Sequence, residues 1–281
     1  MNPDPIFLPS SLRFLRNSPL PRKLGLLEKL YGKTLAAHGK ATVECANGYT
    51  WTLDLDEVTH RWLVYGDCEG QQQKNWLSNW LSHKGGGVFI DSGANIGQYV
   101  VSLSHLPGVQ TFAFEPVSNE MQWLQSCLHR YPEWAVEIVP LALGADKQQL
   151  KIRLAGGKST LRQDWYINQQ LDEELIDMTT LDNFAKEKKI ERIRLWKLDM
   201  EGYEPQALAG AQALLAEQRI DALLIEAQTS TIPAIKQNLA IGNYNLFQIQ
   251  SSSKLVPASD WIEANAFEGN LIALPGKAGD S

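Results

Sequence analysis

The sequence predicts an α/β protein built on a mostly parallel β-sheet that helices cover on both faces. From residue 88 onward, short apolar runs alternate with segments of helical periodicity. Some runs are almost continuously apolar, such as Ala222–Ile225, which suits strands buried on both sides. A length of 281 residues is enough for one large domain with an extension, or for two small domains.

The first part of the chain is expected to form an extension. Five prolines within residues 1–21 predict an irregular arm, and leucines at helical spacing predict a helix over 22–38. Asn47-Gly48, a preferred pair for a type I′ turn, predicts a β-hairpin, and a further helix is expected over 71–83. We therefore divide the chain into residues 1–84, an extension that packs on the core, and residues 85–281, the core.

The core is expected to alternate strands with helices. Strands are predicted at 88–91, 110–115, 136–139, 193–199, 221–226, 244–249 and 270–274, and helices at 95–105, 118–130, 204–217 and 230–240. An insert at about residues 144–192 contains a polar segment and a helix capped near Thr180. Inserts of this size on an α/β sheet usually form functional loops or lids.

The segment Val88–Gly97 predicts a strand, a glycine-containing turn and the start of a helix. Gly93 and Gly97 allow the backbone to turn sharply near a ligand, and a helix starting near Asn95 would offer free N–H groups there. The next apolar run ends in Glu115, whose carboxylate can accept both hydroxyls of a ribose. This order of elements predicts a nucleoside-type cofactor at the carboxyl edge of the sheet.

The turn favours S-adenosylmethionine over a dinucleotide. A dinucleotide site normally carries three glycines, whereas this turn carries only Gly93 and Gly97. Asp91 at the strand end would repel a pyrophosphate but attract an ammonium group. A simpler alternative is a strand-to-helix turn in which the acid caps the helix.

Four sequence blocks carry a more specific resemblance. They are Val88–Gly97, Phe112–Pro116, Val139–Gly144 and Leu198–Glu204. Together they resemble the FkbM family of S-adenosylmethionine-dependent methyltransferases over roughly residues 50–275. The resemblance implies a Rossmann-like class I methyltransferase fold with a seven-stranded, mostly parallel sheet whose last strand is antiparallel. It also implies O-methylation of natural products or sugars.

The resemblance further implies which residues contact the cofactor. They are Asp91, Gly93, Asn95 and Gly97 at the methionine end, Glu115 and Pro116 at the ribose, and Ala142 beside the adenine. Asp199 is a further candidate cofactor contact. Two positions depart mildly from the family pattern. Ser92 stands where an apolar residue is frequent, and Gln98 stands where an aromatic one is common.

Methyl transfer to an alcohol needs an aligned acceptor and a group that removes its proton. Asp199, Glu201 and Glu226 follow apolar runs, so they should lie at the carboxyl edge of the sheet. Asp199 and Glu201 are candidate catalytic residues, and Glu226 is a candidate substrate contact. Alternatively, the three acids could bind Mg²⁺, which prefers carboxylate oxygens, or Glu201 could only cap the next helix.

Other side chains are weaker candidates. His60 is the best imidazole base, although a structural histidine would show the same pattern. Trp165 and Tyr166 lie in the polar insert, where they could stack on a sugar or another planar substrate. Lys197, inside an apolar strand, is expected to reach the sheet edge or to pair with an acid.

Composition limits the function classes. A formal net charge of −6 argues against a general nucleic-acid-binding protein. The first forty residues contain seven basic and two acidic residues, which indicates either a solvated helix face or contact with a membrane or another anionic partner. Three cysteines without close spacing suit a reducing cytoplasm, and no apolar run approaches the roughly 20 residues of a transmembrane segment.

These observations predict a cytoplasmic S-adenosylmethionine-dependent O-methyltransferase. Its expected partner is a small-molecule acceptor with a hydroxyl group, such as a sugar or a product of secondary metabolite biosynthesis. Two alternatives remain, an NAD-type oxidoreductase on a similar sheet and a non-catalytic methyltransferase-like binding module. The oligomeric state stays open, with a homodimer as one candidate.

Overall fold

The computed structural model describes residues 5–18, 20, 23–66, 70–155, 159–162, 170–250, 254–258 and 266–276. The chain forms two compact units. The N-terminal unit contains residues 1–71 and 122–133, and the sheet unit contains residues 72–121 and 134–281. The domain boundary expected at residue 84 stays a prediction.

The described part of residues 1–71 in the N-terminal unit forms helices and a hairpin. They are α1 (Ser10–Arg16), α2 (Lys23–Ala36), β1 (Lys40–Glu44), β2 (Thr50–Asp54) and α3 (Val58–Tyr65). The predicted helix and Asn-Gly hairpin are both present, with Thr42 opposite Thr52 in antiparallel register. The prediction of an irregular arm is wrong where α1 forms, because this short helix buries Leu12 completely.

The sheet unit is built on an eight-stranded sheet with the order β12-β11-β13-β10-β9-β3-β4-β5. The strands are β3 (Gly87–Ser92), β4 (Val109–Phe114), β5 (Ala135–Val139), β9 (Ile193–Leu198), β10 (Leu223–Gln228), β11 (Tyr244–Ile249), β12 (Leu255–Pro257) and β13 (Glu268–Pro275). β13 lies antiparallel between β10 and β11, while β5, β4, β3, β9 and β10 run parallel. The predicted Rossmann-like topology is confirmed, and β12 adds an edge strand to the expected seven.

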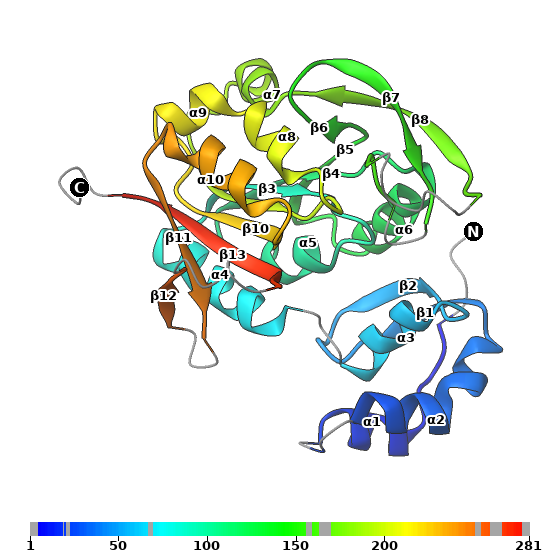
Figure 1. Cartoon of the computed structure of the whole chain (residues 1–281). Helices are drawn as coiled ribbons and strands as arrows, with labels where there is room; N and C mark the ends of the chain where they lie inside the picture. Colours follow the sequence, from blue (N-terminus) through cyan, green and yellow to red (C-terminus); the bar gives the residue numbers. More distant parts are fainter. Residues whose placement is uncertain are drawn as a thin grey trace. The chain divides into compact units, whose positions relative to one another are not determined.

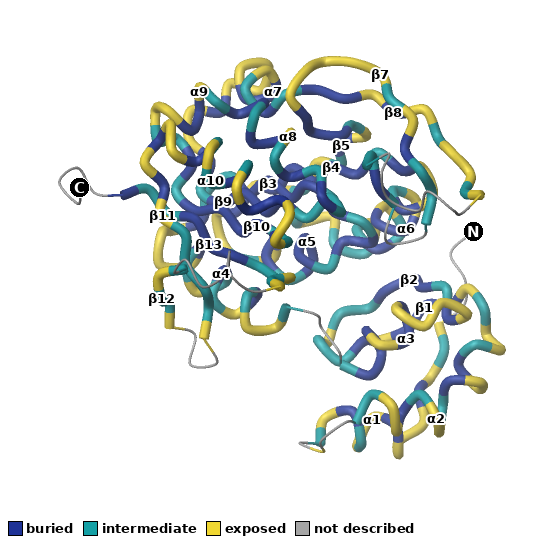
Figure 2. The backbone as a smooth tube through the Cα atoms, in the orientation of Figure 1, coloured by how far each residue is buried: buried dark blue, intermediate teal, exposed yellow. Residues whose placement is uncertain are grey.

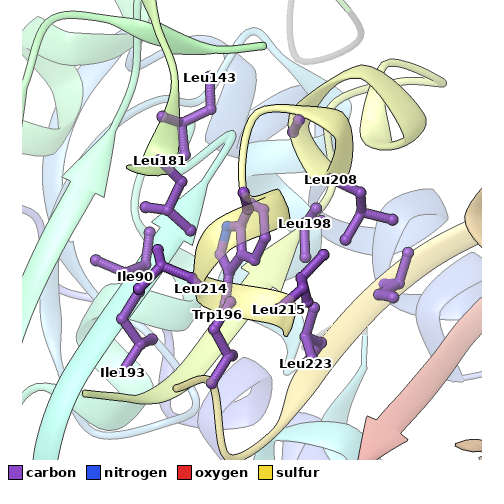
Figure 3. Close-up of a cluster of buried hydrophobic side chains, with 14 of the residues drawn as sticks. Ile90, Leu143, Leu181, Ile193, Trp196, Leu198, Leu208, Leu214, Leu215 and Leu223 are labelled. Carbon is purple, nitrogen blue, oxygen red and sulfur yellow. The ribbon is translucent and has the colours of Figure 1, made fainter. Parts of the chain in front are cut away.

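Helices cover both faces of this sheet (Figure 1). On one face, α4 (Gln71–His83) and α5 (Gln98–Leu103) share a buried cluster with Phe89 and Leu195. The opposite face, which includes Ile90 and Trp196, is covered by α7 (Leu181–Lys188), α8 (Glu204–Ala209), α9 (Gln212–Ala216) and α10 (Ile232–Ala240). Figure 3 shows part of this cluster, with Ile90, Trp196 and Leu208 labelled. Neighbouring strand residues therefore pack in opposite clusters, which explains the nearly continuous apolar runs. Figure 2 shows these central strands buried.

A second sheet lies mainly in the segment predicted as an insert, and its first strand directly precedes that segment. It contains β6 (Ala142–Leu143), β7 (Gln148–Arg153) and β8 (Glu173–Thr179), in the order β6-β8-β7. Ile152, Ile176 and Met178 form part of its buried face. The insert is therefore structured by its own apolar cluster and is more than a polar loop.

Two helix boundaries have clear local causes. The predicted cap of α7 is present, because the Thr180 side chain accepts a hydrogen bond from the Asn183 N–H at 3.1 Å. The helix predicted over 204–217 is instead two helices that are interrupted at Gly210. A Cβ on Gly210 would lie 2.0 Å from the carbonyl oxygen of Gly144, so the chain passes too closely for a side chain. α6 (Ser118–Leu128) follows β4 along the chain.

No helix in the described ranges has the length and apolar character needed to cross a membrane.

Candidate active site

The turn after β3 begins the candidate site at the carboxyl edge of the sheet. Gly93 has a φ of +74° and Asn95 a φ of +50°, both in the left-handed region. A Cβ on Gly93 would lie 1.9 Å from the backbone oxygen of Asp199. Glycine is therefore required both for the turn and for its close contact with the end of β9.

The helix after this turn begins later than expected. α5 begins at Gln98, because its N-cap residue Gly97 has a φ of +95°. The N–H of Asn95 donates to Glu115 Oε2 at 2.7 Å, and the N–H of Ile96 donates to Asn95 Oδ1 at 2.7 Å. The expectation of free N–H groups at Asn95 is therefore wrong, since the protein itself uses these donors.

Glu115 at the end of β4 holds this turn in place. It is buried, and its carboxylate also accepts the Val117 N–H at 2.9 Å. Burial raises the pKa of Glu115 to about 7, although the N–H donors of Val117 and Asn95 oppose the rise. A carboxylate offers about four lone-pair sites, so Glu115 retains acceptor capacity for ribose hydroxyls.

A buried lysine joins the turn to the neighbouring strand. Lys197 Nζ lies 3.0 Å from Asp91 Oδ1 and 3.4 Å from Asp199 Oδ2, and it donates to the Gly93 carbonyl oxygen at 2.9 Å. Burial alone would lower the pKa of Lys197, but the charges of Asp199 and Asp91 raise it above its ordinary value. Lys197 is therefore an ammonium group shared by two carboxylates.

Asp91 is completely buried beneath the turn. Burial raises its pKa, and the Lys197 ammonium opposes that rise. Its Oδ2 atom has no hydrogen-bond partner within the described part of the chain. Burying a carboxylate oxygen without a donor is costly, so this atom fits a ligand that brings an ammonium group.

The structure brings the predicted acids Asp199, Glu201 and Glu226 together. Glu226, in β10, lies close enough to Asp199 for the negative charge of Asp199 to act on its carboxyl group. Burial raises the pKa of Glu226 to about 9, helped by the negative charges of Asp199, Glu201 and Glu204. Glu226 is therefore protonated at neutral pH, which allows it to donate to the Asp199 carboxylate.

Glu204, the first residue of α8, holds the turn that precedes this helix. Its carboxylate accepts the N–H of Met200 at 2.7 Å and the N–H of Gly202 at 3.2 Å. Burial raises the pKa of Glu204 to about 7, against the effect of these donors. Glu204 thus stabilises the turn that carries Glu201.

The geometry gives no support to a magnesium site. Within the residue ranges that the structure describes, no group of three or more His, Cys, Asp or Glu side chains is placed to hold a metal ion. Glu226 instead keeps its proton at neutral pH, because burial raises its pKa to about 9.

The remaining candidates are less informative. His60 belongs to the N-terminal unit, where its Nδ1 accepts the Asp54 N–H at 3.1 Å and its ring meets Trp123 edge-on at 6.0 Å between centroids. Burial lowers the pKa of His60. These contacts account for it structurally, and its role as a base stays a prediction. Trp165 and Tyr166 lie outside the described residues.

Sequence reasoning missed the shared role of Lys197. Lys197 in β9 and Asp199, directly after the end of this strand, are two positions apart, and the Lys197 ammonium group contacts both Asp199 and Asp91. Asp91 is opposite Lys197 in the parallel register of β3 and β9. The spacing was visible in the sequence, but the register was not.

Glu226→Gln is expected to change how stability depends on pH. The pKa of Glu226 is about 9 in the folded chain, against 4.5 as its ordinary value. In the window between these two pH values, the folded chain therefore keeps a proton on Glu226 that the unfolded chain has released. This residue should therefore lower the free energy of unfolding by at most about 1.4 kcal/mol per pH unit as pH rises through the window. Glutamine does not titrate, so the variant should gain stability relative to the wild type with rising pH.

Urea unfolding across this pH window measures the effect of Glu226→Gln. Glu217→Gln is a suitable control, because the Glu217 side chain is 59% exposed. The control should keep a constant offset from the wild type. A constant offset for Glu226→Gln as well would contradict the raised pKa.

The sequence was compared with models of known protein families and with known proteins, and one family model matches it. The methyltransferase FkbM domain matches residues 91–249, which is more than half of the chain. The search of curated proteins gave no match.

Several solved structures show similarity at low identity. An rRNA methylase from Streptococcus thermophilus has 11% identity and a TM-score of 0.42, over 72% of this chain and 93% of that chain. A methyltransferase from Streptococcus mutans in complex with SAH has 12% identity and a TM-score of 0.41, over 72% and 97%. A SAM-dependent O-methyltransferase from Thermotoga maritima has 12% identity and a TM-score of 0.40, over 75% and 67%.

The family assignment rests on the match over residues 91–249. That range begins at Asp91 and includes the glycine turn, Glu115 and the acids after β9. The chain belongs to the FkbM methyltransferase family and is an S-adenosylmethionine-dependent methyltransferase.

Proposed function

We propose that this enzyme methylates a hydroxyl group of a small molecule, such as a sugar or a secondary metabolite. The observation that carries the proposal is the pair of acids on either side of Lys197. Asp91 is fully buried beneath the cofactor turn, whereas the Asp199 side chain is 36% exposed. This difference in exposure supports a division of roles, in which Asp91 would hold the cofactor and Asp199 would face the acceptor.

The turn fits the methionine end of S-adenosylmethionine. When bound, this cofactor supplies a methyl group on a positively charged sulfur. Asp91 Oδ2 would accept the cofactor's ammonium group, which supplies the donor that this buried oxygen lacks. The remaining proposed contacts are Gly93, Asn95 and Gly97 around the methionine, Glu115 and Pro116 at the ribose, and Ala142 beside the adenine.

Asp199 is the proposed base. An alcohol is a weak nucleophile until its proton is removed, whereas a neutral amine needs no such help, so a carboxylate at this position favours oxygen as the acceptor atom. Glu226 holds its own proton at neutral pH, because its pKa is about 9. Glu226 would therefore orient Asp199 or the acceptor by donating a hydrogen bond. Lys197 acts as a positioning residue, because its ammonium group lies 3.4 Å from Asp199 Oδ2.

The insert supports a role in acceptor selection. Thr160, within the insert, donates through its hydroxyl to the Glu201 carbonyl oxygen at 2.9 Å. The insert therefore reaches the acidic edge where the acceptor would bind. Contacts of Trp165 and Tyr166 with the acceptor, a cytoplasmic location and a homodimer stay predictions.

S-adenosylhomocysteine is expected to stabilise the protein against heat. At about 100 times its Kd, the ligand should add about 2.7 kcal/mol, which corresponds to a rise in Tm of roughly 5–10 °C. NADH at the same concentration is the control and should give no shift. A shift with NADH but none with S-adenosylhomocysteine would reverse the cofactor assignment.

The acceptor atom requires a separate experiment. Labelled methyl transfer can be screened against sugars, polyols and phenols, with matched amines as controls, and the product identified by NMR. We expect the label on oxygen. Transfer to nitrogen or carbon alone would reject the proposed O-methylation and leave the family assignment intact.

A further inference from the structure

The exposed apolar side chains of the chain are concentrated in the N-terminal unit. Of the nine large apolar side chains exposed in the described ranges, seven belong to this unit, namely Phe7, Phe14, Leu20, Leu26, Leu30, Val58 and Trp62. Phe7 is 90% exposed and Phe14 is 76% exposed. Single exposed apolar residues are ordinary, but their concentration in one small unit marks an interaction surface.

The outward side of α2 combines apolar and basic residues. Leu26 and Leu30, four positions apart, are 42% and 54% exposed on the side opposite the buried residues of this helix. Lys29 and Lys33 are exposed next to them. The helix therefore presents leucines flanked by lysines.

α1 packs beside α2 and carries further exposed side chains of the same kinds. Tyr31 of α2 donates through its hydroxyl to Ser11 of α1 at 2.8 Å. α1 exposes Arg13 and Phe14. The exposed side chains Arg13, Phe14, Leu26, Lys29, Leu30 and Lys33 define what we call the α1–α2 surface.

The charge of this region is opposite to that of the rest of the chain. Residues 1–40 carry seven basic and two acidic residues, a net charge of +5, which leaves −11 for the remainder of a chain of −6. The acid Glu28 and the base Arg16 are both engaged in ion pairs, with Arg61 and Glu44 respectively. Neither pair involves the basic residues of the α1–α2 surface.

We propose that the α1–α2 surface docks on a membrane that contains anionic lipids. Its phenylalanine and leucine side chains would enter the interfacial layer, and its basic side chains would lie among the headgroups. An acidic protein would complement the basic residues but would not explain protruding apolar side chains such as Phe14. A second copy of this chain on the same face would bring two basic regions together, which is unfavourable. The proposal is independent of the acceptor.

Co-sedimentation of the full-length protein with vesicles tests this docking. Vesicles of phosphatidylcholine with about 30% phosphatidylglycerol should bind the protein, and pure phosphatidylcholine should bind it at least about tenfold more weakly. Raising the salt concentration to about 0.5 M should also weaken binding, because it screens exposed charges.

Paired variants separate the apolar and basic contributions. Leu26→Gln with Leu30→Gln, and Lys29→Gln with Lys33→Gln, should each reduce binding by about tenfold or more. The matched control combines Leu175→Gln and Ile241→Gln, which replace exposed apolar residues of the sheet unit and should leave binding unchanged. An unchanged far-UV circular dichroism spectrum, together with a preserved thermal shift with S-adenosylhomocysteine, shows that each variant is folded.

Three outcomes would overturn the proposal. They are equal binding to both vesicle types, an equal loss of binding in the control variant, and the absence of binding by the wild type. If the wild type is instead a dimer in analytical ultracentrifugation, and Leu26→Gln with Leu30→Gln makes it a monomer without any vesicle binding, the surface binds a second copy.

Discussion

Gly93→Ala is expected to destabilise the sheet unit by about 2–5 kcal/mol and to abolish cofactor binding. The new Cβ would lie 1.9 Å from the Asp199 backbone oxygen, and φ at this residue is +74°. The turn has little room to move, since the N–H groups of Gly93 and Ala94 both donate to the Phe114 carbonyl oxygen, at 3.1 and 2.9 Å. Relief of the clash therefore has to separate the turn from β9.

Gly85→Ala is a matched control for this variant. Gly85 also has a φ of +74°, but a Cβ there would meet no atom within 4 Å. Gly85→Ala should therefore lower the free energy of unfolding by about 1–2 kcal/mol, because only the penalty for a side chain at positive φ applies. Urea unfolding and the thermal shift with S-adenosylhomocysteine measure both variants. Equal destabilisation, with cofactor binding retained in Gly93→Ala, would contradict the close contact with Asp199.

Asp199→Asn is expected to lower kcat by about 10²–10⁴-fold, the usual contribution of a general base. Asparagine preserves the size of the side chain and removes its negative charge. Lys197 would keep Asp91 and the Gly93 carbonyl oxygen as partners, so the cofactor turn should persist. The KM for S-adenosylmethionine should therefore change little.

The other two candidate bases provide the comparison. Glu201→Gln and His60→Asn should each reduce kcat less than Asp199→Asn when measured with the acceptor found by the screen described above. A larger loss for either variant would transfer the role of base to that residue. Unchanged turnover in Asp199→Asn would remove the base assignment altogether.

Local sequence patterns were sufficient to predict the turn and its acids. The strand before Gly93 and the strand ends at Glu115 and Asp199 follow from apolar runs that stop at polar residues, and these rules depend only on near neighbours. Parallel strands end at the same edge of a sheet, so strand direction alone predicts that these acids lie near one another.

Features that depend on tertiary pairing were harder to predict. β12 is only three residues long and exists through pairing with β11, for which the sequence has no local signal. Leu150 and Ile152 alternate correctly for β7, but its partner β8 exposes Leu175, which obscures the pattern. The ion pair of Asp91 with Lys197 joins residues more than a hundred positions apart and required the register of β3 with β9.

The sharing of Lys197 between Asp91 and Asp199 has a thermodynamic consequence for the two halves of the reaction. A cation that binds at Asp91 weakens the attraction of Asp91 for Lys197, which strengthens the hold of Lys197 on Asp199. Occupancy at one carboxylate thus alters the free energy of binding at the other. Because such coupling is reciprocal, cofactor and acceptor must change each other's equilibrium affinity by the same factor.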